Sequence, residues 1–497
     1  MAEQNLTGGT IDSSQNFNPA LGSLVNSDRL APWVWVFLYT AVLASLSAIR
    51  YQAWFATGWD LGLYQQGLWA IWHHGLLASS SLTGLPIVAE SGSLILWLLA
   101  PMYHFGGTGF LFALQSFSLG LGYLGLVRIG EDLGVPARTR HVVGLVYLIY
   151  PALLTANVDD FHPVTLAVPL LFAAVHLGLS RRWIGYGIVV LLTLSVNDVA
   201  GLAVLGLGLG LAFGCSDLRR IVGILTAMAG VVWLILMTGV ILPHWTHQSF
   251  WAPYYQAFGP TSHRAISALS KRPWELFHWL KSTRSLEYVA FIFGPVIGLL
   301  LFKSRWQAWI WFLGALFIVE LNGLSSNAGQ TDPFDQYSVL AIPFVFIALL
   351  AIMQRVEWKT GWRYRWRSWI PVLFLLVTMY HLHETTWHGA PSNTVELVAA
   401  EALVPKRVPV VAQNFIMPHF SNRDQLLDTN QLGSIPLKVG SYVILDSEFT
   451  TGNTSASLLS AWTKYLIKTQ KVVYEKKGVT AIRIVHRVAK GVIVVHG

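Results

Sequence analysis

Acidic and histidine side chains recur in short polar segments between long apolar runs. Asp60 lies in Gly58-Trp59-Asp60-Leu61-Gly62, and two aspartates and a histidine lie together in Asp159-Asp160-Phe161-His162-Pro163. Carboxylates at membrane depth are costly, so they indicate function by default. A carboxylate can take the proton of an attacking hydroxyl group as a general base. The sequence therefore gives Asp60 as the first candidate for such a base and Asp160 as the second, with His162 close to both.

Helix capping is the structural alternative for each acidic segment. Asp60 could cap an interfacial helix over Leu61–His73, and Asp198 could cap a helix that starts after a break at Asn197. Pro163 suits the first position of a helix, so one preceding aspartate could be its cap. Capping does not explain two aspartates and a histidine together.

Two further groups of side chains allow more than one interpretation. His381, Glu384 and His388 share a face at helical spacing, with His383 beside them, and zinc accepts such ligands. Their place at a membrane interface, where histidine is common, explains them better, so no metal site is predicted there. A divalent ion shared by acidic residues could assist catalysis, although the sequence does not require one. The aromatic run from Phe250 to Phe258 fits either an interfacial belt or sugar-stacking faces.

The composition indicates which elements must position these residues. Of the 497 residues, 54% are hydrophobic and only 12% are charged, against about 25% charged in an average soluble domain. That deficit excludes an ordinary soluble enzyme, and the apolar residues come in blocks that a bilayer accepts. The single cysteine, Cys215, excludes a disulfide framework. The absence of a GxxxxGK[ST] motif argues against a nucleotide-driven pump.

The apolar blocks predict an all-α polytopic membrane bundle with about eleven crossings. A crossing helix needs roughly 20 apolar residues. The run Leu94–Tyr103 is too short and is predicted to be an interfacial or re-entrant helix. The predicted crossings lie near residues 32–49, 107–127, 141–157, 163–179, 183–197, 199–214, 221–242, 287–302, 306–322, 338–354 and 369–382.

The distribution of basic residues predicts the orientation. With the N-terminus inside, the inner loops hold fifteen Lys and Arg residues and the outer loops hold six, as the positive-inside rule requires. Residues 1–31 are predicted to be a disordered cytoplasmic tail, and residues 32–384 the membrane domain. Residues 385–497 have ordinary polarity and alternate between strand-like and helix-like runs. They predict a small extracytoplasmic α/β domain, whose helix Ser455–Thr469 turns Trp462 and Leu466 inward.

Several short motifs, in a fixed order, resemble a known family. The stretch Trp59–Trp69 resembles the first-loop motif of a prokaryotic polytopic membrane protein family known as domain of unknown function 2079. The resemblance continues through Leu99–Tyr103, Asp160-Phe161-His162-Pro163, Asp198 and Asp335-Gln336-Tyr337. It extends into the C-terminal segment at Val410-Val411-Ala412, Pro418–Arg423 and Tyr442–Asp446.

That family is similar to the glycosyltransferase C superfamily of multi-span membrane enzymes. The resemblance implies transfer of a sugar from a polyprenyl-phosphate donor to a glycan or protein acceptor on the outer face. No nucleic-acid partner is expected, because most basic residues lie in short loops between apolar blocks or in the C-terminal segment. It also implies an acidic catalytic residue in the first outer loop, a position that Asp60 matches. The leaving phosphate needs cations, and the large outer loop offers several. The candidate substrate-binding residues are Gln66, Trp69, Glu90, Asp159, Asp198, Arg264, Lys271, Arg272, Asp335 and Tyr337.

The sequence departs from the family pattern at several polar positions. Gln65 stands where a second aspartate is expected, and Ser91-Gly92-Ser93-Leu94 replaces a His-Phe-Ser-Pro motif. Val164 replaces a glutamate, and Val196-Asn197 replaces a Lys-Glu pair. These departures favour a second hypothesis, a non-catalytic protein that binds or flips a lipid-linked glycan. A secondary transporter is a third, although its usual inverted repeats are not evident.

Overall fold

The computed structural model describes most of the chain, in six segments and six single residues. The segments are residues 19–247, 270–297, 306–333, 335–354, 391–449 and 455–492; the single residues are Tyr254, Tyr255, Arg264, Ser267, Leu376 and Tyr380. The predicted crossing over 369–382 and the candidate metal ligands His381, His383, Glu384 and His388 lie outside this description, apart from Leu376 and Tyr380.

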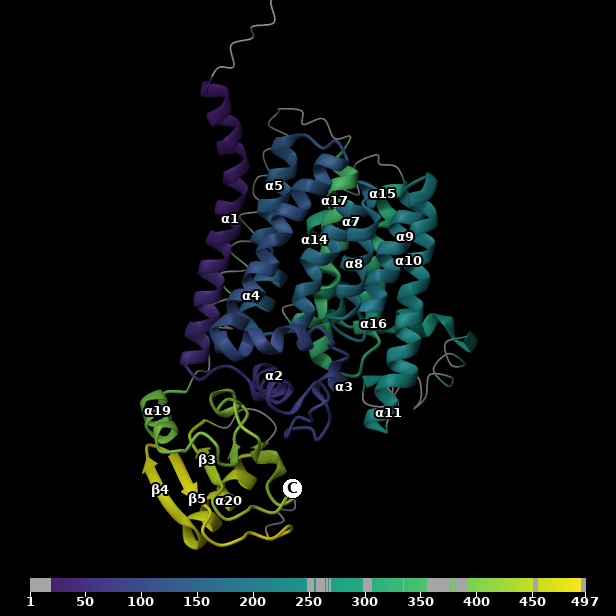
Figure 1. The fold of residues 1–497 in the computed structure, drawn as a ribbon. Helices are drawn as coiled ribbons and strands as arrows, with labels where there is room; N and C mark the ends of the chain where they lie inside the picture. The colour runs from purple at the N-terminus through teal and green to yellow at the C-terminus, as the bar shows by residue number, and fades with distance from the viewer. Residues whose placement is uncertain are drawn as a thin grey trace, which may run out of the picture.

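The described chain up to residue 353 forms a helical bundle (Figure 1). Its long helices run roughly side by side, and short helices and turns lie at their ends. The longer helices are α1 (Pro19–Gln52), α2 (Leu63–His74), α4 (Leu96–Asp132), α5 (Ala137–Leu148), α6 (Pro151–Asp159), α7 (Ala167–Leu179), α8 (Trp183–Leu194), α9 (Ala200–Gly214), α10 (Asp217–Leu236), α14 (Thr283–Ile297), α16 (Phe312–Gly323) and α17 (Ile342–Met353). The short elements are η1 (Gly58–Gly62), α3 (Ile87–Ser91), η2 (Pro163–Leu166), η3 (Met237–Ile241), α11 (Leu242–Thr246), η5 (Pro273–Lys281), α15 (Trp306–Ile310), η6 (Ala328–Thr331) and η7 (Gln336–Ser338).

Among the described helices, three are long and apolar enough to cross a membrane by themselves. They are Pro32–Gln52 of α1, the whole of α4, and Asp217–Thr246, which joins α10 to α11. Helices α5 and α6 are bent by 42° at their junction, and the pair counts as a fourth span if it crosses as one. Shorter apolar helices lie at other predicted crossings: Pro163–Leu179, Trp183–Leu194, Ala200–Gly214, Ala308–Gly323 and Ile342–Met353. The prediction of a mostly helical membrane protein is confirmed, whereas the number eleven stays a prediction.

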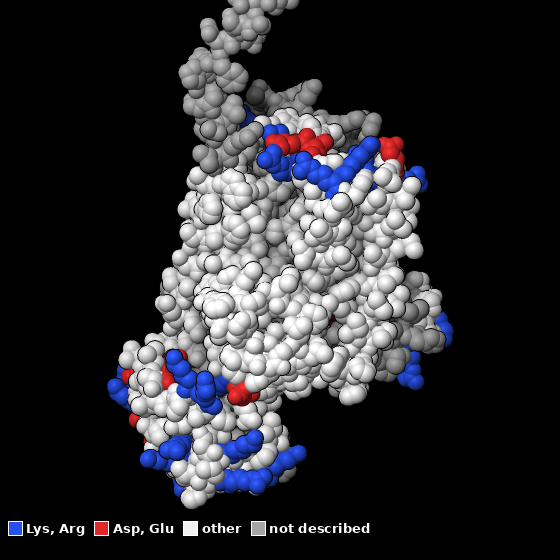
Figure 2. All heavy atoms as spheres, in the orientation of Figure 1, with Lys and Arg blue, Asp and Glu red and all other residues white. Residues whose placement is uncertain are grey.

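The outer surface of the bundle is apolar. On α10, for example, Ile221, Leu225, Met228 and Val232 are all exposed. On the face shown in Figure 2, charged residues gather at the two ends of the molecule and leave an uncharged belt between them. Exposed apolar side chains in such a belt are stable in lipid and costly in water.

Two helix boundaries differ from the expectation, and a third agrees with it. Helix α1 begins at Pro19, whereas the sequence predicted a polar tail up to residue 31; proline suits the first turn of a helix. In α4, Gly107 has a non-helical backbone with φ of 60°. It separates the segment that begins at Leu96 from the long helix that follows, as the sequence predicted. The bend between α5 and α6 precedes Pro151, which lacks the N–H needed to continue a helix.

The C-terminal segment forms a mixed five-stranded sheet with helices, as predicted in outline. Strands β2, β1 and β3 are parallel, and β5 pairs antiparallel with both β3 and β4, in the order β2-β1-β3-β5-β4. Trp462 and Leu466 of α20 are buried, as expected. The elements are α19 (Thr394–Ala402), β1 (Val410–Ala412), η9 (Met417–Phe420), β2 (Leu426–Asp428), η10 (Thr429–Gln431), β3 (Tyr442–Asp446), α20 (Ala456–Thr469), β4 (Lys471–Lys476) and β5 (Val479–Arg483).

This domain lies against one end of the bundle, at the end of α1 and beside α2 (Figure 1). Trp54 and Leu82 of the first loop region share a hydrophobic core with its residues, including Val410, Ile416 and Met417. Their burial joins the domain to the loop that carries Asp60.

Candidate active site

Asp60 lies in the π-helical turn η1, between α1 and α2, and its side chain is 39% exposed. Its Oδ2 accepts a hydrogen bond from Thr57 Oγ1 at 2.8 Å, and its Oδ1 lies 3.1 Å from His162 Nε2. Helix α2 follows with Gly62 as its N-cap and has no side-chain cap. The carboxylate of Asp60 therefore contacts side chains across the fold, and the capping alternative does not describe it.

His162 precedes η2 and is almost fully buried, with its side chain 3% exposed. Its Nε2 faces Asp60, and its Nδ1 lies 3.2 Å from the carbonyl oxygen of Asp160. Both ring nitrogens thus face acceptors, an arrangement that suits the doubly protonated imidazolium. Burial lowers the pKa of His162, but the hydrogen bond and charge of Asp60 outweigh burial and raise it to about 9.

The same contacts act on Asp60 in the opposite sense. Burial raises the pKa of Asp60, but the hydrogen bond and charge of His162 and the hydrogen bond of Thr57 outweigh burial and lower it below its usual 3.8. At neutral pH the two residues therefore form an ion pair. The negative member is exposed enough to meet a substrate, and the positive member is not.

A second, deeper ion pair supports the first. Arg50 lies in the last turn of α1. Its Nη1 lies 2.8 Å from Asp160 Oδ1, and its Nη2 lies 3.2 Å from Asp159 Oδ1. The other oxygen of Asp160 accepts a hydrogen bond from the backbone N–H of Thr57 at 2.9 Å. The hydroxyl of Thr57 has one proton and lies between two carboxylates, 2.9 Å from this oxygen and 2.8 Å from Asp60 Oδ2. Through Thr57, the Arg50–Asp160 pair therefore fixes the start of the turn that carries Asp60.

Gln115 of α4 holds the segment that contains Asp160 and His162. Its Nε2 donates to the carbonyl oxygens of Asn157 and Asp160 at 2.9 and 2.7 Å. Its Oε1 accepts from the backbone N–H of His162 at 2.9 Å and from Thr165 Oγ1 at 3.1 Å. One buried amide thus satisfies four groups of an irregular turn, whose polar backbone would otherwise be costly to bury.

The carboxylate of Asp335 and the hydroxyl of Tyr337 are both affected by the charges of Asp60 and Asp159. Burial raises the pKa of Asp335 to about 8, with further upward contributions from the charges of Asp159, Asp332 and Asp60. Burial also raises the pKa of Tyr337, and the charges of Asp60, Asp335 and Asp159 raise it further. Both residues thus lie within reach of the charges of Asp60 and Asp159, and their part in a substrate site stays a prediction.

Other predicted site residues lie elsewhere or in different roles. Asp198 Oδ1 accepts from the N–H of Val199, its neighbour in the chain, at 2.9 Å. Helix α9 has Val199 as its N-cap and no side-chain cap, so the capping alternative does not describe Asp198. Glu90 lies in α3, where burial raises its pKa. Gln66 is buried, with Nε2 3.4 Å from the carbonyl oxygen of Arg423, and Trp69 stacks on His73. The predicted cations of the outer loop are exposed: Arg264, Lys271 and Arg272.

The sequence did not single out the residues that hold the site together. Arg50 was counted only as an outer-loop charge, although a basic residue ending an apolar run was a usable signal. Thr57 and Gln115 carry no sequence signal of their own. Neither does Asn414 of the C-terminal domain, whose Oδ1 accepts from Gly58 N at 2.8 Å and Trp59 N at 3.1 Å.

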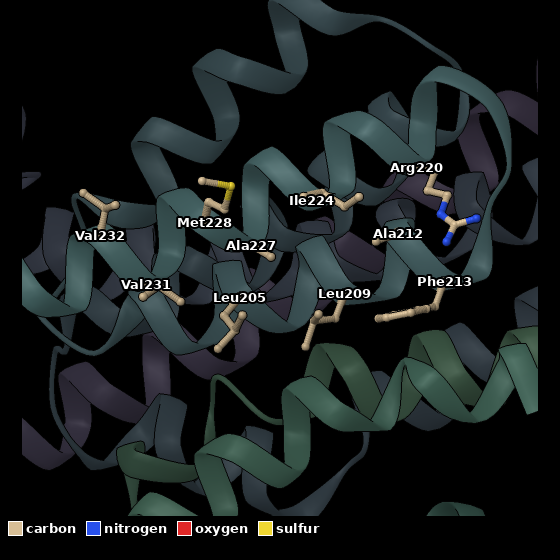
Figure 3. Close-up of a pocket in the computed structure, with 10 residues that line it drawn as sticks. All are labelled: Leu205, Leu209, Ala212, Phe213, Arg220, Ile224, Ala227, Met228, Val231 and Val232. Carbon is tan, nitrogen blue, oxygen red and sulfur yellow. The ribbon is translucent and has the colours of Figure 1, made fainter. Parts of the chain in front are cut away.

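A pocket of about 400 Å³ lies between α9 and α10 (Figure 3). Its lining is apolar except for Arg220, and it includes no acidic residue. None of the residues around Asp60 lines it. Among the described residues, no group of three His, Cys, Asp or Glu side chains is placed to hold a metal ion.

A helical membrane bundle with a mixed-sheet domain docked on its first loop is the class of protein that these features define. The chain belongs to the family described as "Predicted membrane protein (DUF2079)", which matches residues 50–476. No curated protein matches the sequence.

Two solved structures share the fold. The structure of ArnT from Cupriavidus metallidurans bound to undecaprenyl phosphate aligns with a TM-score of 0.55 and 13% identity over 90% of this chain and 97% of that one. ArnT from Cupriavidus metallidurans in the apo state aligns with a TM-score of 0.50 and 13% identity, over 91% and 98%. At this identity the similarity is one of fold.

Proposed function

We propose that this protein is a membrane glycosyltransferase that transfers a sugar from a polyprenyl-phosphate donor to an acceptor at the outer face of the membrane. The observation that carries the proposal is the Asp60–His162 pair, which presents an ionised, half-exposed carboxylate on the first loop. The fold shared with a protein solved with undecaprenyl phosphate supports the lipid class of the donor.

In the proposed reaction, an acceptor hydroxyl oxygen attacks the anomeric carbon of the sugar. The bond from that carbon to the phosphate oxygen breaks, and the polyprenyl phosphate leaves with the bonding electrons. The hydroxyl proton passes to Asp60. Pairing with His162 keeps Asp60 ionised but makes it a weak base, so the proton transfer accompanies the attack and does not precede it. A single displacement of this kind inverts the anomeric centre.

We assign the remaining residues according to their exposure. Asp160 is only 2% exposed, and both its oxygens are engaged by Arg50 and Thr57, so we assign it a positioning role in place of the second base that the sequence suggested. Arg264, Lys271 and Arg272 are the candidates to neutralise the leaving phosphate, together with Arg284, whose Nη2 lies 3.9 Å from Asp332. We place residues 385–497 and Asp60 on the outer face and the N-terminus inside, in accord with the distribution of basic residues.

The test is Asp60→Asn in the purified full-length protein, assayed with a panel of labelled polyprenyl-phosphate sugars. Loss of a positioned general base should lower transfer by about 10²–10⁴-fold. The matched control is Asp424→Asn, which removes an exposed aspartate paired with His74 on the same side of the molecule and should leave transfer unchanged. Full activity in Asp60→Asn would contradict the assignment.

A binding protein on the same fold is the second candidate. The lowered pKa of Asp60 makes it a poor base, and several polar positions of the family pattern are missing, including those at Gln65, Val164, Val196 and Asn197. Saturable binding of a polyprenyl-phosphate sugar by the wild type, with no transfer to any acceptor, would favour this candidate.

A further inference from the structure

The turn that carries Asp60 has its first N–H groups satisfied by a residue from the other end of the chain. The opening N–H groups of a helical turn have no partner within the turn, and a serine, threonine or asparagine just before it usually accepts from them. Thr57 occupies that position but makes no such bond, because its hydroxyl lies against Asp60 and Asp160. Asn414 Oδ1 accepts from Gly58 N and Trp59 N instead.

A second contact holds the next side chain of the turn. Trp59 Nε1 donates to Asp428 Oδ2 at 2.6 Å. Asp428 is itself fixed, because its Oδ1 accepts from Asn430 N at 3.1 Å in the capping box of η10. The aspartate is only 1% exposed, so the indole of Trp59 binds to a rigid acceptor.

The backbone of the turn also lies in direct contact with the domain. A Cβ atom at Gly58 would lie 2.6 Å from Met417 Cε and 2.8 Å from the carbonyl oxygen of Asn414. Such distances exclude any side chain without movement of the domain or the turn. The turn is therefore held between the domain on one side and the Arg50–Asp160–Thr57 contacts on the other.

We propose that Asn414 is a positioning residue, which holds the η1 turn in the orientation that places the Asp60 carboxylate against His162. Its meaning for catalysis rests on the proposed function, but the positioning itself does not. The C-terminal domain then completes the active site without supplying a catalytic group.

The experiment measures the pKa of His162 in the full-length protein by NMR of ¹³C-labelled histidine, with the signal assigned by its loss in His162→Asn. Nearby opposite charge typically shifts a pKa by about 1–3 units. If Asn414→Ala releases the turn, the Asp60 carboxylate moves away and the pKa of His162 falls by at least about one unit. Asp60→Asn removes the charge altogether and therefore shows the largest fall in the pKa of His162 to be expected.

Two variants separate positioning from general damage. Asn414→Asp keeps an acceptor for both N–H groups and should restore the wild-type pKa of His162. Asn422→Ala is the matched control, because Asn422 accepts from Tyr103 at the same interface without touching the turn, and it should leave that pKa unchanged. If Asn414→Ala does not fold, Trp59→Phe, which keeps an aromatic ring but removes the indole N–H bonded to Asp428, should lower the pKa of His162 in the folded protein.

The outcomes separate this inference from the proposed function. A fall in the pKa of His162 in Asn414→Ala, reversed in Asn414→Asp, supports positioning even if no transfer is ever detected. Where transfer is measurable, Asn414→Ala should lower kcat with little change in KM. An unchanged pKa of His162 in folded Asn414→Ala and Trp59→Phe, or an equal fall in Asn422→Ala, would overturn the inference whether or not the protein is a transferase.

Discussion

Arg50 and Asp160 form a buried ion pair at 2.8 Å, although 110 residues separate them in the chain. The pair joins the end of α1 to the segment after α6, and through Thr57 it reaches the loop of Asp60. Breaking a buried pair by removing one partner leaves the other charge uncompensated in a poorly solvated place.

We therefore expect Arg50→Ala to destabilise the purified protein by about 3–5 kcal/mol. Reversible unfolding of the protein in detergent would measure the change. Arg128→Ala is the control, because Arg128 pairs with Glu131 at an exposed position, where such pairs contribute about 0–1 kcal/mol. Equal losses in the two variants would show that the Arg50 pair has no special structural role.

The Asp60–His162 pair should give stability a defined dependence on pH. The pKa of His162 rises from 6.5 to about 9 on folding, so its contribution is complete below pH 6.5 and is lost as the pH rises through about 9. The pKa of Asp60 falls below 3.8, so its contribution is present above pH 3.8 and is lost at more acid pH.

The wild type should thus lose thermal stability between pH 6.5 and 9 relative to His162→Asn, which lacks the titrating ring. Melting temperatures across that range would test this. His73→Asn, a change at an exposed histidine of α2, should keep the wild-type pH profile. If the melting temperatures of the wild type and His162→Asn changed with pH in the same way, the result would argue against the ion pair.

Gly58→Ala should disrupt the junction between the turn and the C-terminal domain, since the new methyl group would overlap Met417 and the backbone of Asn414. Proteolysis of the full-length protein should then release the domain faster than in the wild type. Gly187→Ala is a fair comparison, because a Cβ there meets nothing within 4 Å, and it should change neither stability nor cleavage. If Gly58→Ala resisted proteolysis as well as the wild type does, the junction would have adjusted to the added methyl group and the prediction would be wrong.

The proposed orientation places Cys215 at the inner face and α20 at the outer face. A membrane-impermeant maleimide should fail to label Cys215 in intact cells. Since Cys215 is only half exposed, Ser460→Cys and Arg182→Cys, both at exposed positions, extend the test in a Cys215→Ser background. Labelling of Ser460→Cys alone is expected, and labelling of Arg182→Cys in unbroken cells would reverse the orientation.

Local patterns predicted the bundle and part of the site, because apolar runs and acidic residues within them are visible in the sequence. The grouping of Asp60 with His162, Asp335 and Tyr337 followed from placing their loops on one side of the membrane. The capping alternative for Asp198 does not hold, because α9 has no side-chain cap. Three-residue strands such as β2 are too short to give a pattern.

Contacts between distant segments could not be predicted in this way. Gln115 lies in an apolar helix, and only the fold shows that its amide holds the turn before His162. Asn414 and Asp428 are ordinary polar residues until the domain docks on η1. Their roles depend on packing between segments more than 350 residues apart, which no local periodicity records.

The span of 355 residues between Trp59 and Asn414 also bears on how the protein is made. The ribosome releases the first loop long before the partner of that loop. A nascent chain with its first helices already inserted still has an η1 turn with unsatisfied N–H groups and an Asp60 that nothing holds from the outer side. Under the proposed orientation, the chain acquires the contact that positions Asp60 in one late event, after the C-terminal domain has reached the outer face and folded. Under the proposed function, an unfinished chain therefore lacks a positioned base.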